Sequence, residues 1–190
     1  MIHDVVLEGQ RVRLRPLRDD DVPLLFGWFN DREVLHWLHL SEDPPDLIGS
    51  LDAHRERWER IRDDGSQISW CIETTEGRPI GDIGLLAIHS THHRAELGIT
   101  IGVKDYWSSG YGTEAIGTLL GYAFGEMGLR RVQLITDEDN ARGIRCYEKC
   151  GFVREGLLRE HRLRYGKPLN MLIMGALKEE WEGKEVGSRK

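Results

Sequence analysis

The 190-residue chain lacks several features that define other protein classes. Its three cysteines, Cys71, Cys146 and Cys150, form neither an extracellular disulfide framework nor a Cys-x-x-Cys motif, so we expect reduced, packed thiols. No apolar run approaches the length that spans a bilayer, and charged residues interrupt the N-terminal segment too early for a signal peptide. The sequence therefore predicts a cytoplasmic protein without a membrane partner.

An excess of positive charge is also missing. The net charge is −6, which gives no electrostatic reason to expect a nucleic-acid partner and is compatible with a substrate that carries positive amines. His89, His92 and His93 lie in one polar loop and could hold a metal ion. Because no carboxylate or cysteine pattern supports them, we expect solvated histidines and no metal site.

No repeat, low-complexity linker or break in composition divides the chain, so we expect one domain over residues 1–178, followed by a charged, frayed tail over residues 179–190. Strands are interspersed with helices, which indicates a mixed α/β fold built around one sheet. Alternating apolar residues predict strands near 11–17, 69–74, 80–88, 95–103, 131–136, 152–164 and 169–177. Helical spacing predicts helices near 19–30, 46–62, 111–127 and 139–151, the first of them capped by Asp19 to Asp21.

A turn at the start of the predicted helix 111–127 has the composition of a phosphate-binding site. A strand followed by a glycine-bearing turn that opens a helix brings unpaired N–H groups and the helix dipole together. The turn consists of Ser108, Ser109, Gly110, Tyr111, Gly112 and Thr113. It lacks the lysine of a P-loop and the glycine spacing of a dinucleotide fingerprint. The glycines alone are also consistent with a tight turn that binds nothing.

Two segments together resemble the GNAT superfamily of acyl-CoA-dependent N-acyltransferases: Tyr106 to Ala115, which contains this turn, and Asn140 to Phe152. The opening Arg13 to Leu17 with Asp19 to Asp21, and the ending from Leu158–His161 through Met174 to Trp181, resemble the Rim-type branch, which modifies ribosomal-protein N-termini or spermidine. The resemblance implies a mostly antiparallel sheet that is splayed between its fourth and fifth strands, with acetyl-CoA in the gap. It also makes a homodimer an expectation.

Cofactor contacts follow from this resemblance. The turn Ser108–Thr113 is expected to hold the pyrophosphate. Main-chain groups of Ile101 and Val103 are expected to pair with the pantetheine arm, and Asn140 to bind that arm from the other side, in addition to capping its helix. Two positions depart from the family pattern: Trp107 replaces the usual glutamine or arginine, and Gly143 replaces a serine proposed to assist proton transfer.

Acetyl transfer to an amine requires a base for the amine, a donor for the oxyanion and a proton for the thiolate. Within the resemblance, Tyr147 is expected to be the general acid, although an aromatic packed in the core is the alternative. Glu96 is expected to be the base, with a rim salt bridge or a water relay as its alternative. A main-chain N–H near Ile101 is expected to bind the oxyanion. The amine attacks directly, without a covalent enzyme intermediate.

The acceptor is expected to be a primary amine: a protein N-terminus, a polyamine or an aminoglycoside-like sugar amine. Carboxylates beside aromatic rings suit such a substrate, and the expected acceptor residues are Trp28, Asn30, Asp31, Glu33, His36, Trp37, Glu42, Asp43 and Asp46. Two other functions stay open. A non-catalytic sensor would bind acyl-CoA without turnover, and a nucleotide binder would use the same turn for ATP or NAD.

Overall fold

Eight strands form one sheet in the computed structural model, which describes residues 5–38, 49–63 and 65–188. The strands are β1 (Leu7–Glu8), β2 (Val12–Pro16), β3 (Ile68–Thr74), β4 (Pro79–His89), β5 (Arg94–Ile101), β6 (Arg131–Asp137), β7 (Val153–Arg164) and β8 (Lys167–Leu177). Their order in the sheet is β1-β2-β3-β4-β5-β6-β8-β7. All neighbours are antiparallel except β5 and β6, which are parallel.

The sheet opens between β5 and β6. These strands pair only at their first residues, from Arg94 opposite Arg131 to Glu96 opposite Gln133. Beyond Glu96 they diverge, and β6 continues on its other edge against β8 up to Asp137. Because β1 adds a short edge strand that the sequence did not predict, the gap lies between the fifth and sixth strands of the structure. The predicted splayed, mostly antiparallel sheet is confirmed.

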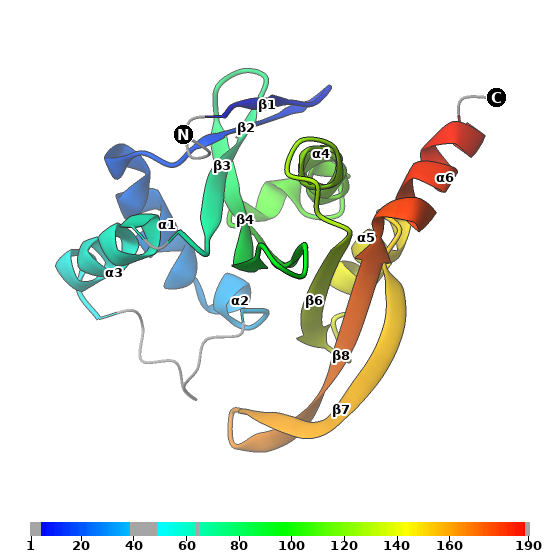
Figure 1. The fold of residues 1–190 in the computed structure, drawn as a ribbon. Helices are drawn as coiled ribbons and strands as arrows, with labels where there is room; N and C mark the ends of the chain where they lie inside the picture. Colours follow the sequence, from blue (N-terminus) through cyan, green and yellow to red (C-terminus); the bar gives the residue numbers. More distant parts are fainter. Residues whose placement is uncertain (1–4, 39–48, 64, 189–190) are drawn as a thin grey trace.

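Six α-helices of the described residues accompany the sheet: α1 (Val22–Phe29), α2 (Arg32–Leu35), α3 (Leu51–Asp63), α4 (Tyr111–Gly125), α5 (Ala141–Lys149) and α6 (Lys178–Ser188). Figure 1 shows α1 and α3 together on one side of the molecule, while the β7–β8 hairpin curves away on the other. Helix α4 packs its apolar face, including Ile116, Leu119 and Phe124, into the core. The described helices therefore surround the gap with α1 to α3 on one side and α4 and α5 on the other.

Two predictions about local structure were wrong. The frayed tail is instead helix α6, because Trp181 packs on Phe124 of α4 at 5.7 Å between ring centroids. The domain boundary at residue 178 stays a prediction. Asp21 precedes α1, but its side chain makes no capping hydrogen bond to that helix. Its carboxylate accepts from the Arg18 N–H in the 3-10 turn before α1 and also binds Arg15 at 2.7 and 2.8 Å, so it joins this turn to β2.

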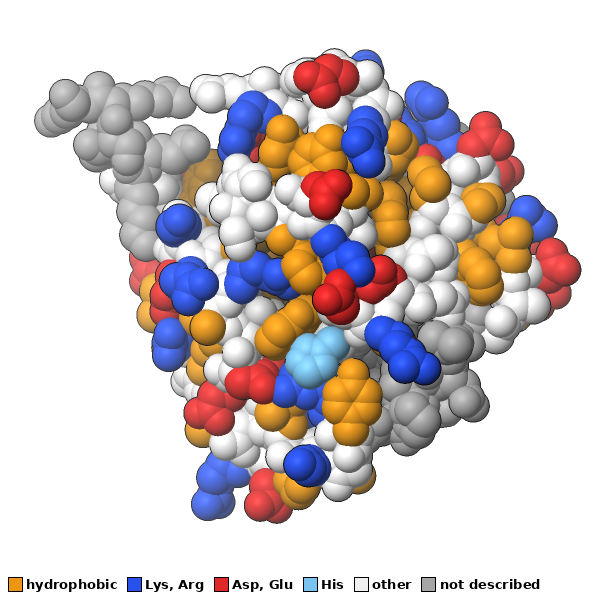
Figure 2. Space-filling model, turned by 180° about the vertical axis from the view of Figure 1, so that it is seen from behind, with side chains coloured by type: hydrophobic (Ala, Val, Ile, Leu, Met, Phe, Trp, Pro, Cys, Tyr) orange, Lys and Arg blue, Asp and Glu red, His pale blue; other side chains and the backbone are white. Residues whose placement is uncertain are grey.

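The molecular surface mixes charges of both signs. Figure 2 shows acidic, basic and apolar side chains interspersed over one face, with no single broad region of one kind. Within the described part of the chain, no helix has the length and apolar character needed to cross a membrane.

Candidate active site

Two cavities meet at the opening between β5 and β6. The first, of about 260 Å³, lies between α4 and α5 and is called here the α4–α5 cavity. The second, of about 440 Å³, lies under α1 and α3 and is called the α1–α3 cavity. Both cavities are lined by Trp37, Leu38, Ile99, Thr100, Asn140 and Tyr147. A molecule bound in one cavity therefore lies next to a molecule bound in the other.

The predicted phosphate-binding turn forms the entrance of α4. Ser108 and Gly110 adopt left-handed conformations with φ of 59° and 90°. Gly110 is the N-cap and supplies no side chain to the first turn, so the first N–H groups of α4 have no capping partner. Ser108, Gly110, Gly112 and Thr113 line the α4–α5 cavity. These groups can bind the oxygens of a phosphate.

Two of the predicted turn residues lie outside the lining of this cavity. The Ser109 hydroxyl donates to the Trp107 carbonyl at 3.2 Å. The Tyr111 ring packs edge-on against Tyr106 at 4.9 Å, and the Arg11 guanidinium lies 5.0 Å above it. The side chains of Ser109 and Tyr111 therefore stabilise the turn from behind.

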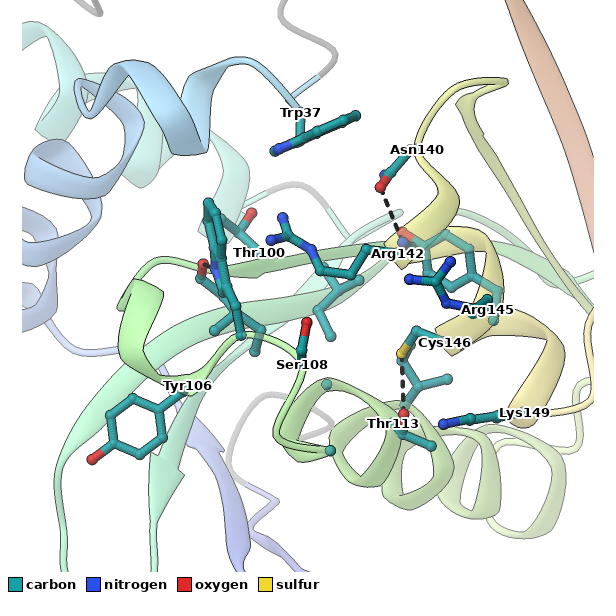
Figure 3. A pocket seen from close by; sticks show the side chains of 18 of the residues that line it. Trp37, Thr100, Tyr106, Ser108, Thr113, Asn140, Arg142, Arg145, Cys146 and Lys149 are labelled. Atoms are coloured by element: carbon teal, nitrogen blue, oxygen red, sulfur yellow. Dashed lines mark hydrogen bonds between the residues drawn. The ribbon is translucent and has the colours of Figure 1, made fainter.

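A row of positive charge on α5 was not predicted. Arg142, Arg145 and Lys149 all line the α4–α5 cavity, and their spacing of three and four residues places them on one helix face. Figure 3 shows Arg142 and Trp37 reaching into the same space. The Arg142 guanidinium also lies 3.8 Å from the centre of the Trp107 ring. The helical spacing of these three cations was the available sequence signal.

Neither Ile101 nor Val103 is confirmed as a pantetheine contact, and the main-chain groups of the two residues have different hydrogen-bond partners. The Gly102 N–H donates to Ile80 of β4, so strand alternation turns the main-chain groups of Ile101 toward the gap. The Ile101 carbonyl already accepts a hydrogen bond from the Trp107 indole at 2.6 Å, which leaves its N–H facing the gap. Val103 donates its N–H to Ile80 and accepts from Tyr106, so both of its main-chain groups are occupied.

Asn140 both caps α5 and lines both cavities. Its Oδ1 accepts from the Gly143 N–H at 3.0 Å, and its Nδ2 donates to the Thr136 hydroxyl at 3.2 Å. A Cβ added at Gly143 would lie 2.5 Å from Asn140 Nδ2. A larger residue at position 143 would therefore require the Asn140 side chain to shift.

Tyr147 stands at the junction of the two cavities. Its ring packs against Phe152 with 6.1 Å between centroids, which fixes its position on α5. Burial raises the pKa of the Tyr147 hydroxyl, the neighbouring Cys146 and Cys150 raise it further, and Arg142 and Thr136 oppose the shift. The hydroxyl therefore keeps its proton at neutral pH, as a general acid must.

The floor of the α1–α3 cavity is one face of the β4–β5 pair. Three cross-strand pairs form it: Asp82 with Thr100, Gly84 with Gly98, and Leu86 with Glu96. Directly paired residues of antiparallel strands point to the same side, so these six positions share a face. The two glycines leave the centre of the floor open. The predicted base Glu96 therefore faces this cavity, at the end where β5 and β6 are still paired.

Asp82 was not predicted as a site residue. Its Oδ1 is shielded from solvent and has no hydrogen-bond partner in the part of the chain that the structure describes. Burial raises the pKa of the carboxyl to about 7, while a hydrogen bond with Thr100 opposes the shift. In the sequence Asp82 resembles any polar residue that alternates along a strand, so no sequence signal marked it.

Replacing Asp82 by asparagine should stabilise the fold at neutral pH but not in acid. Because the folded pKa is raised from 3.8 to about 7, this carboxyl favours folding while protonated, and stability falls as the pH rises toward 7. The advantage of Asp82→Asn should therefore grow by up to about 1.4 kcal/mol per pH unit between pH 4 and 7. Urea unfolding at pH 4, 5.5 and 7 measures it, and a pH-independent difference would contradict the buried charge.

The predicted acceptor residues are only partly brought together. Trp37 lines both cavities, whereas Asp31 and Glu33 form ion pairs with Lys104 on the surface. The remaining described candidates contact protein groups: Trp28 packs on Gly102, Asn30 donates to the Phe26 carbonyl, and His36 stacks on Tyr165. Glu42, Asp43 and Asp46 lie outside the described residues.

The histidine loop does not form a metal cluster within the described ranges. His89 and His92 stack at 4.2 Å between ring centroids, and the His92 N–H donates to the His89 ring. The His89 and His92 rings therefore pack against each other.

Comparison with known proteins agrees with this geometry. The family described as "Acetyltransferase (GNAT) domain" matches residues 11–153. The uncharacterised N-acetyltransferase YoaA of Bacillus subtilis is 30% identical over 176 residues, covering 91% of this chain and 97% of YoaA. Spermidine N(1)-acetyltransferase of Escherichia coli K12 is 29% identical over 164 residues, covering 86% and 84%.

A solved structure shares the fold. The spermidine N-acetyltransferase of Vibrio cholerae, in complex with CoA and spermine, superposes with a TM-score of 0.82 at 24% identity, covering 92% of this chain and 99% of that one. The family match, the splayed sheet and the glycine turn agree, and together they show that the chain belongs to the GNAT family and is an acetyl-CoA-dependent N-acetyltransferase.

Proposed function

We propose that the protein transfers the acetyl group of acetyl-CoA to a primary amine by direct attack within a ternary complex. The meeting of the two cavities at Tyr147 is the observation that carries this proposal. The α4–α5 cavity has the groups that suit the cofactor, and the α1–α3 cavity has carboxylates that suit an amine. The two reactants would therefore meet without a covalent enzyme intermediate.

The cofactor is proposed to enter along α4 and α5. Its pyrophosphate would accept hydrogen bonds from the N–H groups at the start of α4, with Arg145 and Lys149 supplying positive charge. The pantetheine arm would lie in the gap between the Ile101 N–H and Asn140. The thioester would then reach the junction beside Tyr147, where a main-chain N–H of β5 would bind the oxyanion.

The chemistry needs two proton transfers. An alkyl ammonium has a pKa near ~10, so a base must remove its proton before attack. The carboxylates that line the α1–α3 cavity can take it, and Glu96 is the one expected from the sequence. When the C–S bond breaks, Tyr147 would donate its proton to the sulfur. Linear polyamines are the acceptor class to test first, because the E. coli relative is named for spermidine.

A thermal-shift experiment tests the cofactor site. Acetyl-CoA at about 100 times its Kd should stabilise the protein by about 2.7 kcal/mol, whereas ATP and NAD should not. The matched variant is Gly112→Val. A Cβ at Gly112 meets its nearest atoms only at 3.7 Å, so the fold should persist, while the added methyl groups would narrow the α4–α5 cavity and should weaken the stabilisation by acetyl-CoA. Stabilisation by ATP or NAD alone would identify a nucleotide binder instead.

An amine panel tests the reaction. CoA release should appear with at least one of a polyamine, an N-terminal peptide and an amino sugar. Tight acetyl-CoA binding with no CoA release from any of them would identify a non-catalytic acyl-CoA sensor.

A further inference from the structure

We propose that Asp82 is the carboxylate that binds the acceptor ammonium and removes its proton. The inference rests on the proposed acetyl transfer and identifies the residue that prepares the nucleophile. It is carried by the position of Asp82 in the floor of the α1–α3 cavity, beside the junction, with one oxygen that has no partner among the described residues.

The position of Asp82 relative to the junction distinguishes it from Glu96. Both carboxylates line only the α1–α3 cavity, but Asp82 pairs with Thr100, which lines both cavities, whereas Glu96 pairs with Leu86, which lines the α1–α3 cavity alone. The two carboxylates stand on adjacent strands at the two ends of the floor, offset by four residues along the strand. At ~3.4 Å per residue, their backbones are roughly 14 Å apart along the sheet. One ammonium therefore cannot lie beside both residues, and Asp82 is the carboxylate nearer the junction.

The surroundings of Asp82 favour a positive partner. The side chains that face this region are Cys71 of β3, Glu96 of β5, His54 of α3 and Tyr147 of α5. Arg15 of β2 lies on the same face beyond Cys71, but its guanidinium is held by Asp21 and Glu73. The Asp82 carboxyl has no cationic partner in the described chain. Buried carboxylates are normally paired. An incoming ammonium would supply the missing charge, and the rings of Trp37 and Trp58 in the cavity wall suit a cation.

The proton balance is complete without a further reactant. The ammonium transfers one proton to Asp82 Oδ1, and its nitrogen keeps the bonding pair. That lone pair attacks the thioester carbon, the tetrahedral adduct collapses with loss of the C–S bond, and the sulfur takes the proton of the Tyr147 hydroxyl. Tyr147 regains a proton from the adduct nitrogen, and Asp82 releases its proton to solvent. Because the pKa of Asp82 is raised to about 7, its carboxyl can accept a proton from the ammonium and release it to solvent at neutral pH.

The pH dependence of kcat/KM, measured with an amine that the wild type accepts, separates the two carboxylates. The wild type should show a rise in kcat/KM with an inflection near pH 7 as Asp82 ionises. Asp82→Asn should lower kcat/KM about 100-fold and abolish this inflection, with unchanged acetyl-CoA affinity by calorimetry. Glu96→Gln should keep the inflection, whatever its effect on the rate. Loss of the inflection in Glu96→Gln and its retention in Asp82→Asn would overturn the proposal.

A weakly basic acceptor gives a second, independent readout. A hydrazide is uncharged at neutral pH and needs no base, so the defect of Asp82→Asn should shrink to less than about 10-fold with it. An equal defect with both acceptors would show that Asp82 acts only through the structure of the cavity. Failure of acetyl transfer itself would look different, because the wild type would then release no CoA with any amine.

Discussion

Replacing Tyr147 by phenylalanine should lower kcat by about 100-fold or more while leaving the affinity for acetyl-CoA unchanged. Phenylalanine keeps the ring that packs on Phe152, so only the hydroxyl at the junction is lost. Without that proton donor, the thiolate of CoA must leave unprotonated or take a proton from water. Stopped-flow CoA release and calorimetry of acetyl-CoA binding measure the two quantities separately.

The raised pKa of Tyr147 adds a prediction about alkaline pH. Because burial keeps the hydroxyl protonated, loss of wild-type activity through this group should occur only above the ordinary tyrosine value of about 10. Tyr122→Phe is the matched control: Tyr122 is also partly buried, packs edge-on against Trp70 at 5.9 Å and lines neither cavity. It should keep full activity. A Tyr147→Phe enzyme with most of its rate intact would assign the protonation step to water.

Replacing Arg15 by methionine should destabilise the fold by about 3–5 kcal/mol at pH 7. Arg15 is only 6% exposed and binds two carboxylates, Asp21 in the turn before α1 and Glu73 on β3. The variant leaves the Asp21 carboxylate without its cation and leaves Glu73 only the longer contact with Arg13, at 3.9 Å. Burial alone would raise the pKa of Asp21, but hydrogen bonds from Arg15 and from the Arg18 main chain hold it below its usual 3.8.

The pH dependence of that loss has a definite sign. A carboxylate with a lowered folded pKa contributes stability above its unfolded value, and this contribution disappears as the pH falls through the folded pKa. The deficit of Arg15→Met should therefore be largest near pH 7 and shrink in acid, as measured by urea unfolding. Arg13→Met is the control, since this half-exposed neighbour on β2 should cost at most about 1 kcal/mol. A deficit that is the same at both pH values would contradict the charge mechanism.

Most of the fold could be predicted because its helices and strands carry regular apolar spacing. The helix 111–127 and the strand 131–136 correspond closely to α4 and β6. Helix α6 was missed because Trp181, which anchors it, packs against Phe124, far away in the chain. The cap expected from Asp21 failed because its carboxylate binds the Arg18 N–H and the Arg15 guanidinium, and local composition does not show these partners.

Some residues of the candidate site could be predicted from the sequence and others could not. The glycine turn and Tyr147 belong to contiguous motifs, so they could be identified from the sequence. Asp82 could not, because its importance depends on Thr100 across the strand pair and on the cavity that opens beside it. The three cations on α5, Arg142, Arg145 and Lys149, were not predicted, although their helical spacing is visible in the sequence.

The glycine pair in the floor of the α1–α3 cavity has a consequence for substrate range. At Gly84 an added Cβ would lie 2.7 Å from the Ile68 carbonyl, so the backbone itself excludes a side chain there. At Gly98 the nearest atom is the end of the Leu86 side chain, at 3.4 Å. A single substitution at Gly98 should therefore shorten the recess and favour smaller acceptors, while the proposed proton-transfer groups and the α4–α5 cavity keep their places.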